Sequence, residues 1–184
     1  MEKIKKLILV FCVSLLIGCN QSNEAGLVYG DNNAEIEVVN YTSFQCPDCY
    51  ELHNKLNSSL KKYIESGEIK FIEKPIDISR FEFDDLIYKY MTDEQSKDFD
   101  FLTKIYETQN EWIVFNNQND VIEFFSLGHN ENKDNISDLK KITNEKQRLE
   151  LEEVPTMYIN GQKIANTITV EEFESKIEEI LNAN

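Results

Sequence analysis

Two patterns of apolar residues alternate along this chain, one typical of β-strands and one typical of amphipathic helices. The change from one pattern to the other marks where strands and helices begin and end. β-Branched and aromatic residues crowd positions 36–44, IEVVNYTSF, and 69–76, IKFIEKPI, as expected of central strands. Between them an apolar residue recurs every fourth position, which predicts an amphipathic helix over 47–66 that stops at Gly67. A short strand is expected at 26–30, so the first half of the chain reads as a strand followed by a β-α-β unit.

After the second long strand the pattern becomes helical. Apolar residues with i, i+3, i+4 spacing predict four helical segments, at 83–91, 102–106, 120–128 and 135–150, the third ending at Gly128. We therefore expect roughly 80–150 to form a helical insertion.

Strand character returns near the end. Residues 156–164, TMYINGQKI, contain Asn160-Gly161, a strong signal for a two-residue hairpin. Thr169 and Glu172 then have capping-box spacing in front of an amphipathic closing helix. These elements predict an α/β fold, and 184 residues fit one domain with an insertion.

The N-terminal residues predict export rather than fold. MEKIKK is basic, and the apolar run 7–17 is too short to cross a bilayer. The following LIGCN resembles the lipobox of bacterial lipoprotein signals, which implies a signal peptide over 1–18, a lipid on Cys19 and a tether over 19–26, with the folded domain at 27–184. An uncleaved anchor or an ordinary signal peptide with an incidental cysteine is the alternative. Either way, the domain works outside the cytoplasm.

The charge narrows the range of partners. The chain has a formal net charge of -15, and removal of residues 1–18, with three lysines and one glutamate, makes it two units more negative. Nucleic acid is excluded as a partner by this acidity. Attachment to an anionic membrane would depend on the lipid and not on a basic patch.

Cysteines carry the candidate chemistry. Of the four, Cys46 and Cys49 remain in the folded domain. A purely structural disulfide between them would close so short a loop that it would add little to the stability of the fold. A structural metal needs four ligands, and besides this pair the chain has His53, expected on a helix surface, and His129, expected in a loop. We therefore expect no metal site, although a metal-binding or metal-delivery lipoprotein stays open as an alternative.

The redox interpretation uses every local feature. Cys46 lies where a strand gives way to a helix, so free backbone N–H groups and the helix dipole can stabilise its thiolate. Pro47 is suited to the first turn, where its missing N–H has no partner. Cys46 is thus the candidate nucleophile, and Cys49, nearly one turn later and less exposed, the candidate resolving cysteine of a redox disulfide.

Three segments together, VVNYTSFQCPDC, the helical insertion and EVPTMYINGQKI, resemble the DsbA-like thiol-disulfide oxidoreductases of the thioredoxin superfamily. The resemblance implies a thioredoxin-like fold with a central mixed sheet, no cofactor, exported proteins with cysteine thiols or disulfides as substrates, and a membrane partner that resets the cysteines. It also implies that Pro155 is a cis-proline beside the cysteine pair and that Val154 contacts the substrate. Oxidation of substrates is the expected direction, with reduction or isomerisation by the same residues as the alternative.

Two departures from that family bear on mechanism. Asn40 stands where strongly oxidising members carry a buried glutamate, and Asp48 stands where they carry a histidine. Acidic residues near the pair, Asp48 together with Glu51, Glu152 and Glu153, predict a higher thiol pKa and a less oxidising disulfide than in those members. Glu73 is a candidate replacement for the missing carboxylate, with a solvent-facing strand position as the alternative.

Overall fold

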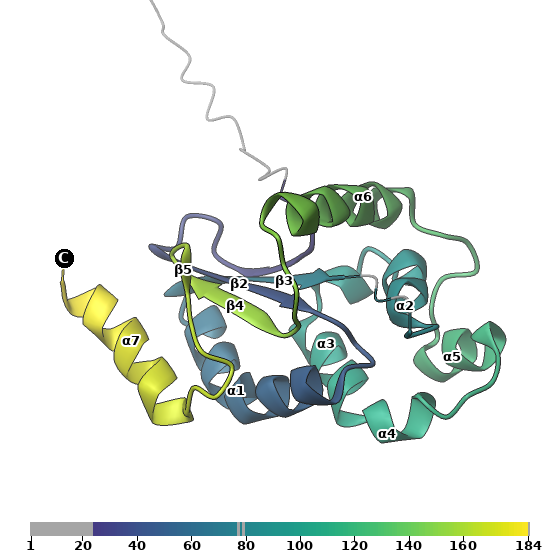
Figure 1. Ribbon diagram of the computed structural model, residues 1–184, viewed down its shortest axis with the longest axis horizontal. Coiled ribbons are helices and arrows are strands. Elements are labelled where there is room, and N and C mark those ends of the chain that lie inside the picture. The colour runs from purple at the N-terminus through teal and green to yellow at the C-terminus, as the bar shows by residue number, and fades with distance from the viewer. Residues whose placement is uncertain (1–23, 77, 79, 184) are drawn as a thin grey trace, which may run out of the picture.

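The centre of the molecule is a five-stranded sheet (Figure 1). The computed structural model describes residues 24–76, 78 and 80–183. The strands are β1 (Leu27–Gly30), β2 (Ile36–Thr42), β3 (Ile69–Pro75), β4 (Thr156–Ile159) and β5 (Gln162–Lys163). They pair in the order β1-β3-β2-β4-β5, with β2 and β3 parallel and the other pairs antiparallel. The predicted α/β fold with a central mixed sheet is confirmed.

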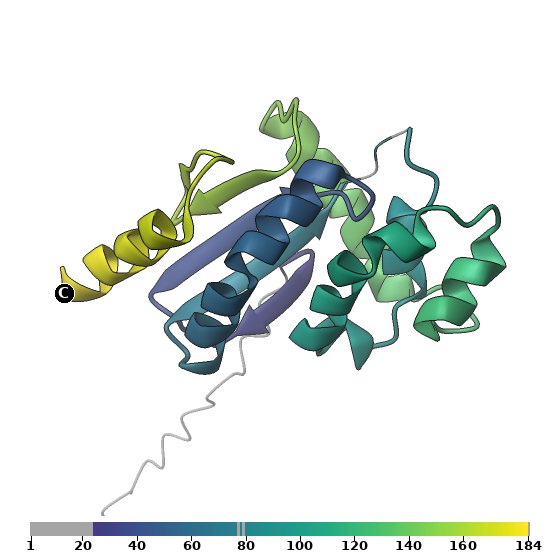
Figure 2. The same ribbon diagram turned by 90° about the horizontal axis from the view of Figure 1, so that it is seen from below.

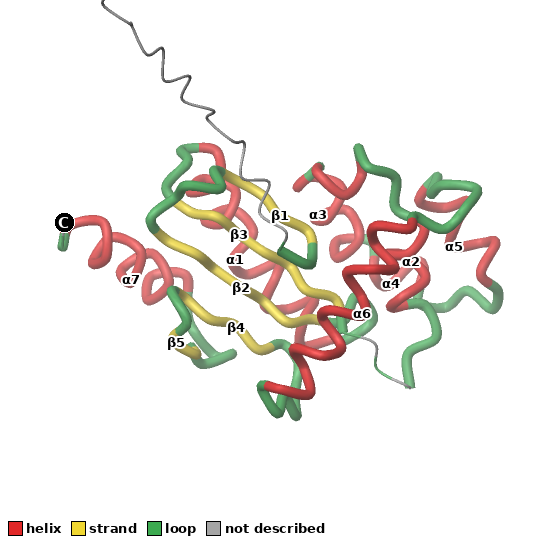
Figure 3. The backbone as a smooth tube through the Cα atoms, turned by 90° about the horizontal axis from the view of Figure 1, so that it is seen from above, coloured by secondary structure: helices red, strands yellow, loops and turns green. Residues whose placement is uncertain are grey.

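Helices cover both faces of this sheet. They are α1 (Pro47–Glu65), α2 (Asp84–Tyr90), a 3-10 helix η1 (Gln95–Lys97), α3 (Phe99–Glu107), α4 (Gln109–Trp112), α5 (Gln118–Phe125), α6 (Lys133–Arg148) and α7 (Val170–Asn182). Figure 2 shows α1 lying across one face, with α3 and α7 beside it. Figure 3 shows α6 on the opposite face, where its Glu145 accepts hydrogen bonds from Tyr41 of β2 and Lys74 of β3.

The helices α2 to α6 all lie between β3 and β4 in the chain, and most of them gather beside one end of the sheet (Figure 1). Asn135 of α6 donates a hydrogen bond to the Tyr88 carbonyl oxygen of α2 at 2.8 Å, which joins the two helices. This end is the one at which β2 and β3 finish, so the helices between β3 and β4 border the loop that follows β2.

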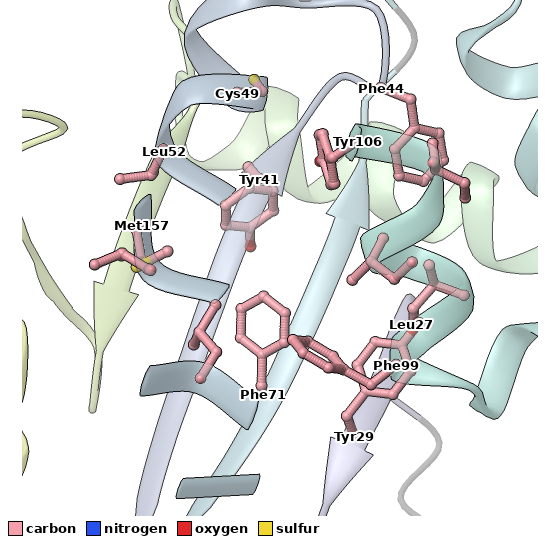
Figure 4. Close-up of a cluster of buried hydrophobic side chains, with 14 of the residues drawn as sticks. Leu27, Tyr29, Tyr41, Phe44, Cys49, Leu52, Phe71, Phe99, Tyr106 and Met157 are labelled. Carbon is pink, nitrogen blue, oxygen red and sulfur yellow. The ribbon is translucent and has the colours of Figure 1, made fainter. Parts of the chain in front are cut away.

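The apolar pattern explains how α1 is held. Leu52, Leu56 and Leu60 project from one face of the helix onto the sheet and are almost completely buried. Beneath them the ring of Phe99 contacts those of Tyr29 and Phe71 edge to face (Figure 4). Burying side chains of this size contributes about 1.5–3 kcal/mol each, so this layer fixes α1 on the sheet.

The hairpin turn and the capping box predicted near the C-terminus are both confirmed. Asn160 and Gly161 both adopt positive φ, 46° and 76°, as a tight hairpin turn between β4 and β5 requires. The Thr169 side chain accepts a hydrogen bond from the Glu172 backbone N–H, and the Glu172 carboxylate accepts one from the Thr169 N–H. This capping box starts α7 at Val170.

Several predicted boundaries differ from those in the structure. The helix expected to end at Gly128 ends at Phe125, because Ser126 adopts the left-handed conformation with φ 52° and closes α5. Residues 24–26 are not tether: Ala25 is 2% exposed and packs in the core. The predicted signal peptide, residues 1–18, and the predicted lipid site Cys19 lie outside the described residues. Within the described part of the chain, no helix has the length and apolar character needed to span a bilayer.

Candidate active site

Cys46 lies at the point where the chain turns from β2 into α1. Its backbone N–H donates to the Ser43 carbonyl oxygen at 3.1 Å, and its own carbonyl oxygen accepts from the Tyr50 N–H at 3.0 Å, so Cys46 is the N-terminal cap of the helix. Pro47 occupies the first helical position, where no N–H is needed. The backbone N–H groups of Asp48 and Cys49, in the first turn of α1, lie close enough to the Cys46 sulfur to stabilise its thiolate.

A second segment, distant in the sequence, completes the surroundings of Cys46. The Cys46 thiol lies 3.8 Å from the carbonyl oxygen of Val154, and the Val154–Pro155 peptide bond is cis. Antiparallel pairing of β4 with β2 brings these residues together, because Pro155 directly precedes the first residue of β4. The arrangement therefore sets a backbone carbonyl, a hydrogen-bond acceptor, beside the Cys46 sulfur.

The two thiols are electrostatically different. A hydrogen bond from Cys49 is the main reason why the pKa of Cys46 is lowered to about 6; the backbone N–H groups of Cys49 and Asp48 lower it further, against burial and the Asp48 charge. Burial raises the pKa of Cys49 far above its usual range. At neutral pH Cys46 is therefore mostly thiolate and Cys49 is a thiol, which is the polarity required for a nucleophile with a buried resolving partner.

Alkylation of Cys46 by iodoacetamide should follow this ionisation, with a rate that is half-maximal near pH 6. The readout is mass spectrometry of samples quenched between pH 4 and pH 9. Cys49→Ala should raise the midpoint because the main hydrogen-bond donor is lost, and Asp48→Asn should lower it because a nearby negative charge is removed. A midpoint near 9 in the native protein would contradict this electrostatic account.

The helical insertion reaches back to hold the cysteine loop. Gln109 of α4 is buried, and its side-chain N–H₂ group donates to the carbonyl oxygens of Phe44 and Cys46, at 2.8 and 3.2 Å. From the loop itself, the Gln45 side-chain oxygen accepts a hydrogen bond from the Phe83 backbone N–H at 2.6 Å. Two residues that follow the loop in the sequence, Phe83 and Gln109, thus hold it in place, and the sequence carried no local sign of either contact.

A buried carboxyl group lies below the cysteines. Glu73 of β3 is fully buried, so the solvent-facing alternative is wrong. Its two oxygens accept hydrogen bonds from the Tyr106 hydroxyl at 2.6 Å and from the Asn40 amide at 2.9 Å. Burial raises the pKa of Glu73 to about 7, although these hydrogen bonds and one from Thr42 oppose the shift. Asn40 and Glu73 are direct partners in the β2–β3 register.

His53 was wrongly expected on the helix surface. It is 3% exposed, and its ring stacks on that of Tyr106 with centroids 4.3 Å apart. Burial lowers the pKa of His53 to about 3, so the ring is neutral. His129 is exposed in a loop, as expected. Among the described residues, no three His, Cys, Asp or Glu side chains are grouped as metal ligands.

The acidic residues expected around the pair remain solvated. Asp48 and Glu51 on α1 and Glu152 and Glu153 before the cis bond are all exposed. Glu153 forms an ion pair with Lys163 at 3.2 Å. Of these four, Asp48 has the direct effect on Cys46 described above, because it sits next to the helix start.

Comparison with known proteins agrees with this geometry. The thioredoxin family model (Thioredoxin_4) matches residues 22–179. Disulfide bond formation protein D from Bacillus subtilis is 23% identical over 84% of this chain and 76% of its own. A conserved protein of unknown function from Enterococcus faecalis V583 superposes with a TM-score of 0.72, at 21% identity, covering 85% of this chain and 91% of its own. Oxidised BdbD from Bacillus subtilis superposes with a TM-score of 0.62 at 20% identity, covering 86% and 98%.

A thioredoxin-like fold that presents a cysteine pair at the start of its first long helix defines a thiol-disulfide oxidoreductase. The chain belongs to the thioredoxin family and is similar to its DsbA-like members.

Proposed function

We propose that this oxidoreductase introduces disulfide bonds into exported proteins on the outer side of a bacterial membrane, where a lipid on Cys19 anchors it. Cys46 is the nucleophile, Cys49 resolves, and the backbone at Val154 and Pro155 receives the substrate chain. In each cycle a substrate thiolate attacks Cys46 of the Cys46–Cys49 disulfide, a second substrate thiol displaces Cys46, and two electrons remain on the enzyme. A membrane partner then removes them.

One observation carries the oxidising direction: the lowered pKa of Cys46. A stabilised thiolate makes Cys46 a good leaving group and favours the reduced form of the enzyme, so its disulfide tends to take electrons from a substrate. A relative named for disulfide bond formation supports the same direction. The location outside the cytoplasm rests on the export signal and lipobox-like sequence, which also accounts for attachment without a membrane-spanning helix in the described chain.

The test is the redox equilibrium of the cysteine pair. A soluble form beginning at Gln21 is incubated over a range of reduced-to-oxidised glutathione ratios and trapped with a thiol-reactive mass tag. We expect both cysteines to switch together at a potential near or above that of glutathione, about -200 mV or higher. A switch far below it would indicate a reductase that receives electrons from the membrane. Failure to switch cooperatively, with stoichiometric zinc or copper retained through dialysis, would indicate a metal-binding lipoprotein.

Anchoring is tested separately in cells. The native chain should label with a fatty-acid analogue and fractionate with membranes, and Cys19→Ser should abolish both. Cys12→Ser, which changes a cysteine of the same predicted signal segment, is the matched control and should leave both unchanged. Equal labelling of the native chain and Cys19→Ser would contradict the lipid attachment.

A further inference from the structure

Four polar side chains form a buried line from the cysteines to the centre of the sheet. The Thr42 hydroxyl lies within hydrogen-bonding reach of the Cys49 sulfur, and it is 2.6 Å from the Tyr106 hydroxyl. Tyr106 in turn donates to Glu73 at 2.6 Å. All four residues are at most 1% exposed. Figure 4 shows Cys49 and Tyr106 near the same end of the sheet.

The hydrogen bonds in this line have one direction. The Tyr106 hydroxyl has a single proton and donates it to Glu73, so Thr42 is the donor in its contact with Tyr106, and the same Thr42 proton can alternatively point directly at Glu73. The Thr42 oxygen can accept from the Cys49 thiol when that thiol no longer donates to Cys46. When the Cys49 thiol turns from Cys46 toward Thr42, every donor in the line points toward the carboxylate, which is the arrangement needed to pass a proton from Cys49 to Glu73.

Glu73 has the surroundings of a group that changes its charge. None of the ion pairs found among the described residues involves it, so no cation holds it ionised. Its partner Asn40 donates to one carboxylate oxygen, while the Asn40 side-chain oxygen is buried without a hydrogen-bond partner. An amide has both a donor and an acceptor end. By turning over, Asn40 can bond either to a carboxylate or to a protonated carboxyl group.

We propose that Glu73 exchanges a proton with Cys49 through the hydroxyl groups of Tyr106 and Thr42, and that Asn40 supports both charge states of the carboxyl group. This inference rests on the proposed function, because it assigns the fate of the Cys49 proton in that reaction. The carboxyl group comes from β3 and not from the strand that leads to the cysteines, where Asn40 stands.

The proton and electron balance is the same in both directions. When a substrate thiolate attacks Cys46, the Cys46–Cys49 bond breaks and Cys49 takes the electron pair; the Glu73 proton then moves along the line to the Cys49 sulfur. In reverse, Cys49 loses its proton to Glu73 and attacks Cys46 of a mixed disulfide, whose partner leaves as a thiolate. In the mixed disulfide Cys46 is no longer a thiolate, so the Cys49 proton is free to turn toward Thr42.

The test separates the two cysteines in one reaction. The full chain carrying Cys12→Ser and Cys19→Ser, in detergent and reduced, is mixed with excess dithiobis-nitrobenzoate, and thionitrobenzoate release is followed by absorbance. Cys46 releases the first equivalent in a phase that depends on reagent concentration. Attack of Cys49 on the resulting mixed disulfide releases the second in a phase that does not. Glu73→Gln should slow the second phase by at least about tenfold at pH 7, the effect of losing a general base, and leave the first within about twofold.

Two further variants keep the result interpretable. Tyr106→Phe keeps the carboxyl group but removes the Tyr106 hydroxyl that links it to Thr42, and it should slow the second phase in the same way. Glu37→Gln, the same change on the neighbouring strand at a side chain that is 39% exposed, should change neither phase. Unchanged second phases in both Glu73→Gln and Tyr106→Phe, or equal slowing of both phases, would overturn the relay. A native protein that releases only one equivalent would overturn the proposed function and the relay with it.

The pH dependence of the second-phase rate distinguishes a proton-transfer role of Glu73 from a purely structural one. The second phase in the native protein should accelerate with pH as Glu73 ionises, and Glu73→Gln should lose this dependence. The other titratable groups facing Glu73 are Tyr29 from β1, Cys49 and His53 from α1 and Tyr106 from α3. All four stay neutral between pH 5 and 8, because burial raises the pKa of the two tyrosines and of Cys49 and lowers that of His53.

Discussion

Cys46→Ser is expected to abolish disulfide exchange, with a loss on the order of a thousandfold or more in the oxidation of a reduced substrate protein. Serine has nearly the same size, but its hydroxyl cannot form the mixed disulfide. Cys49 cannot substitute, since burial raises its pKa far above the working range and keeps it a thiol. The measurement is refolding of a reduced, disulfide-containing protein with catalytic amounts of enzyme.

The Cys49→Ser variant should fail in a different way. Its Cys46 retains the backbone N–H groups that stabilise the thiolate, so it still attacks, but nothing inside the enzyme resolves the product. We expect a long-lived mixed disulfide with substrate, visible on a non-reducing gel and absent in Cys46→Ser. Mixed disulfides that accumulate through Cys49 in the Cys46→Ser protein would reverse the assigned roles.

The second large effect concerns stability, and it goes against the usual result of changing a buried residue. Glu73→Gln should become progressively more stable than the native protein as pH rises from about 4.5 to 8, by about 3 kcal/mol at the upper end. The folded-state pKa of Glu73 is raised to about 7, so between 4.5 and 7 the folded protein holds a proton that the unfolded chain has lost. Stability due to this group therefore falls as pH rises, and glutamine removes that fall.

The native protein and Glu73→Gln must be compared at each pH, because His53 changes the pH dependence of stability in the opposite direction to Glu73. Its folded-state pKa is lowered to about 3, so the unfolded chain binds the extra proton between pH 3 and 6.5 and stability rises with pH there. In the native protein the two contributions nearly cancel between pH 4.5 and 6.5. The measurement is urea unfolding of both proteins at pH 4.5, 6 and 8, and a difference in stability that does not change with pH would contradict a buried, titrating Glu73.

Together the kinetic and stability experiments separate function from structure at Glu73. A variant that is more stable at pH 8 yet slower in the Cys49 step would show that the native protein retains an unfavourable buried charge for its chemistry. Polar groups at functional sites commonly reduce stability in this way. A residue with only a structural role would lose stability and both reaction phases together.

Several features of this protein followed from the sequence alone, because they depend on residues close together in the chain. The strand before the cysteines, the helix after them and the Asn160-Gly161 turn are all set by local periodicity and backbone preference. The position of Cys46 at the start of a helix was predictable for the same reason, because a helix start with its free N–H groups depends on residues close together in the chain. The family resemblance added the cis bond at Pro155, which local pattern does not reveal.

Other features required the tertiary structure. Whether Glu73 faced solvent or core was open until α1 and α3 were seen to cover its face of the sheet, and His53 was misplaced because its helix is covered on two sides. Tyr106 contacts Thr42, just before the cysteine loop, and Gln109 contacts the Cys46 carbonyl, each from more than sixty residues away in the sequence. The sequence thus identified Cys46 and Cys49 as the candidate reactive residues. Only packing between distant segments decided which buried groups, Thr42, Tyr106 and Glu73 among them, stand beside the cysteines.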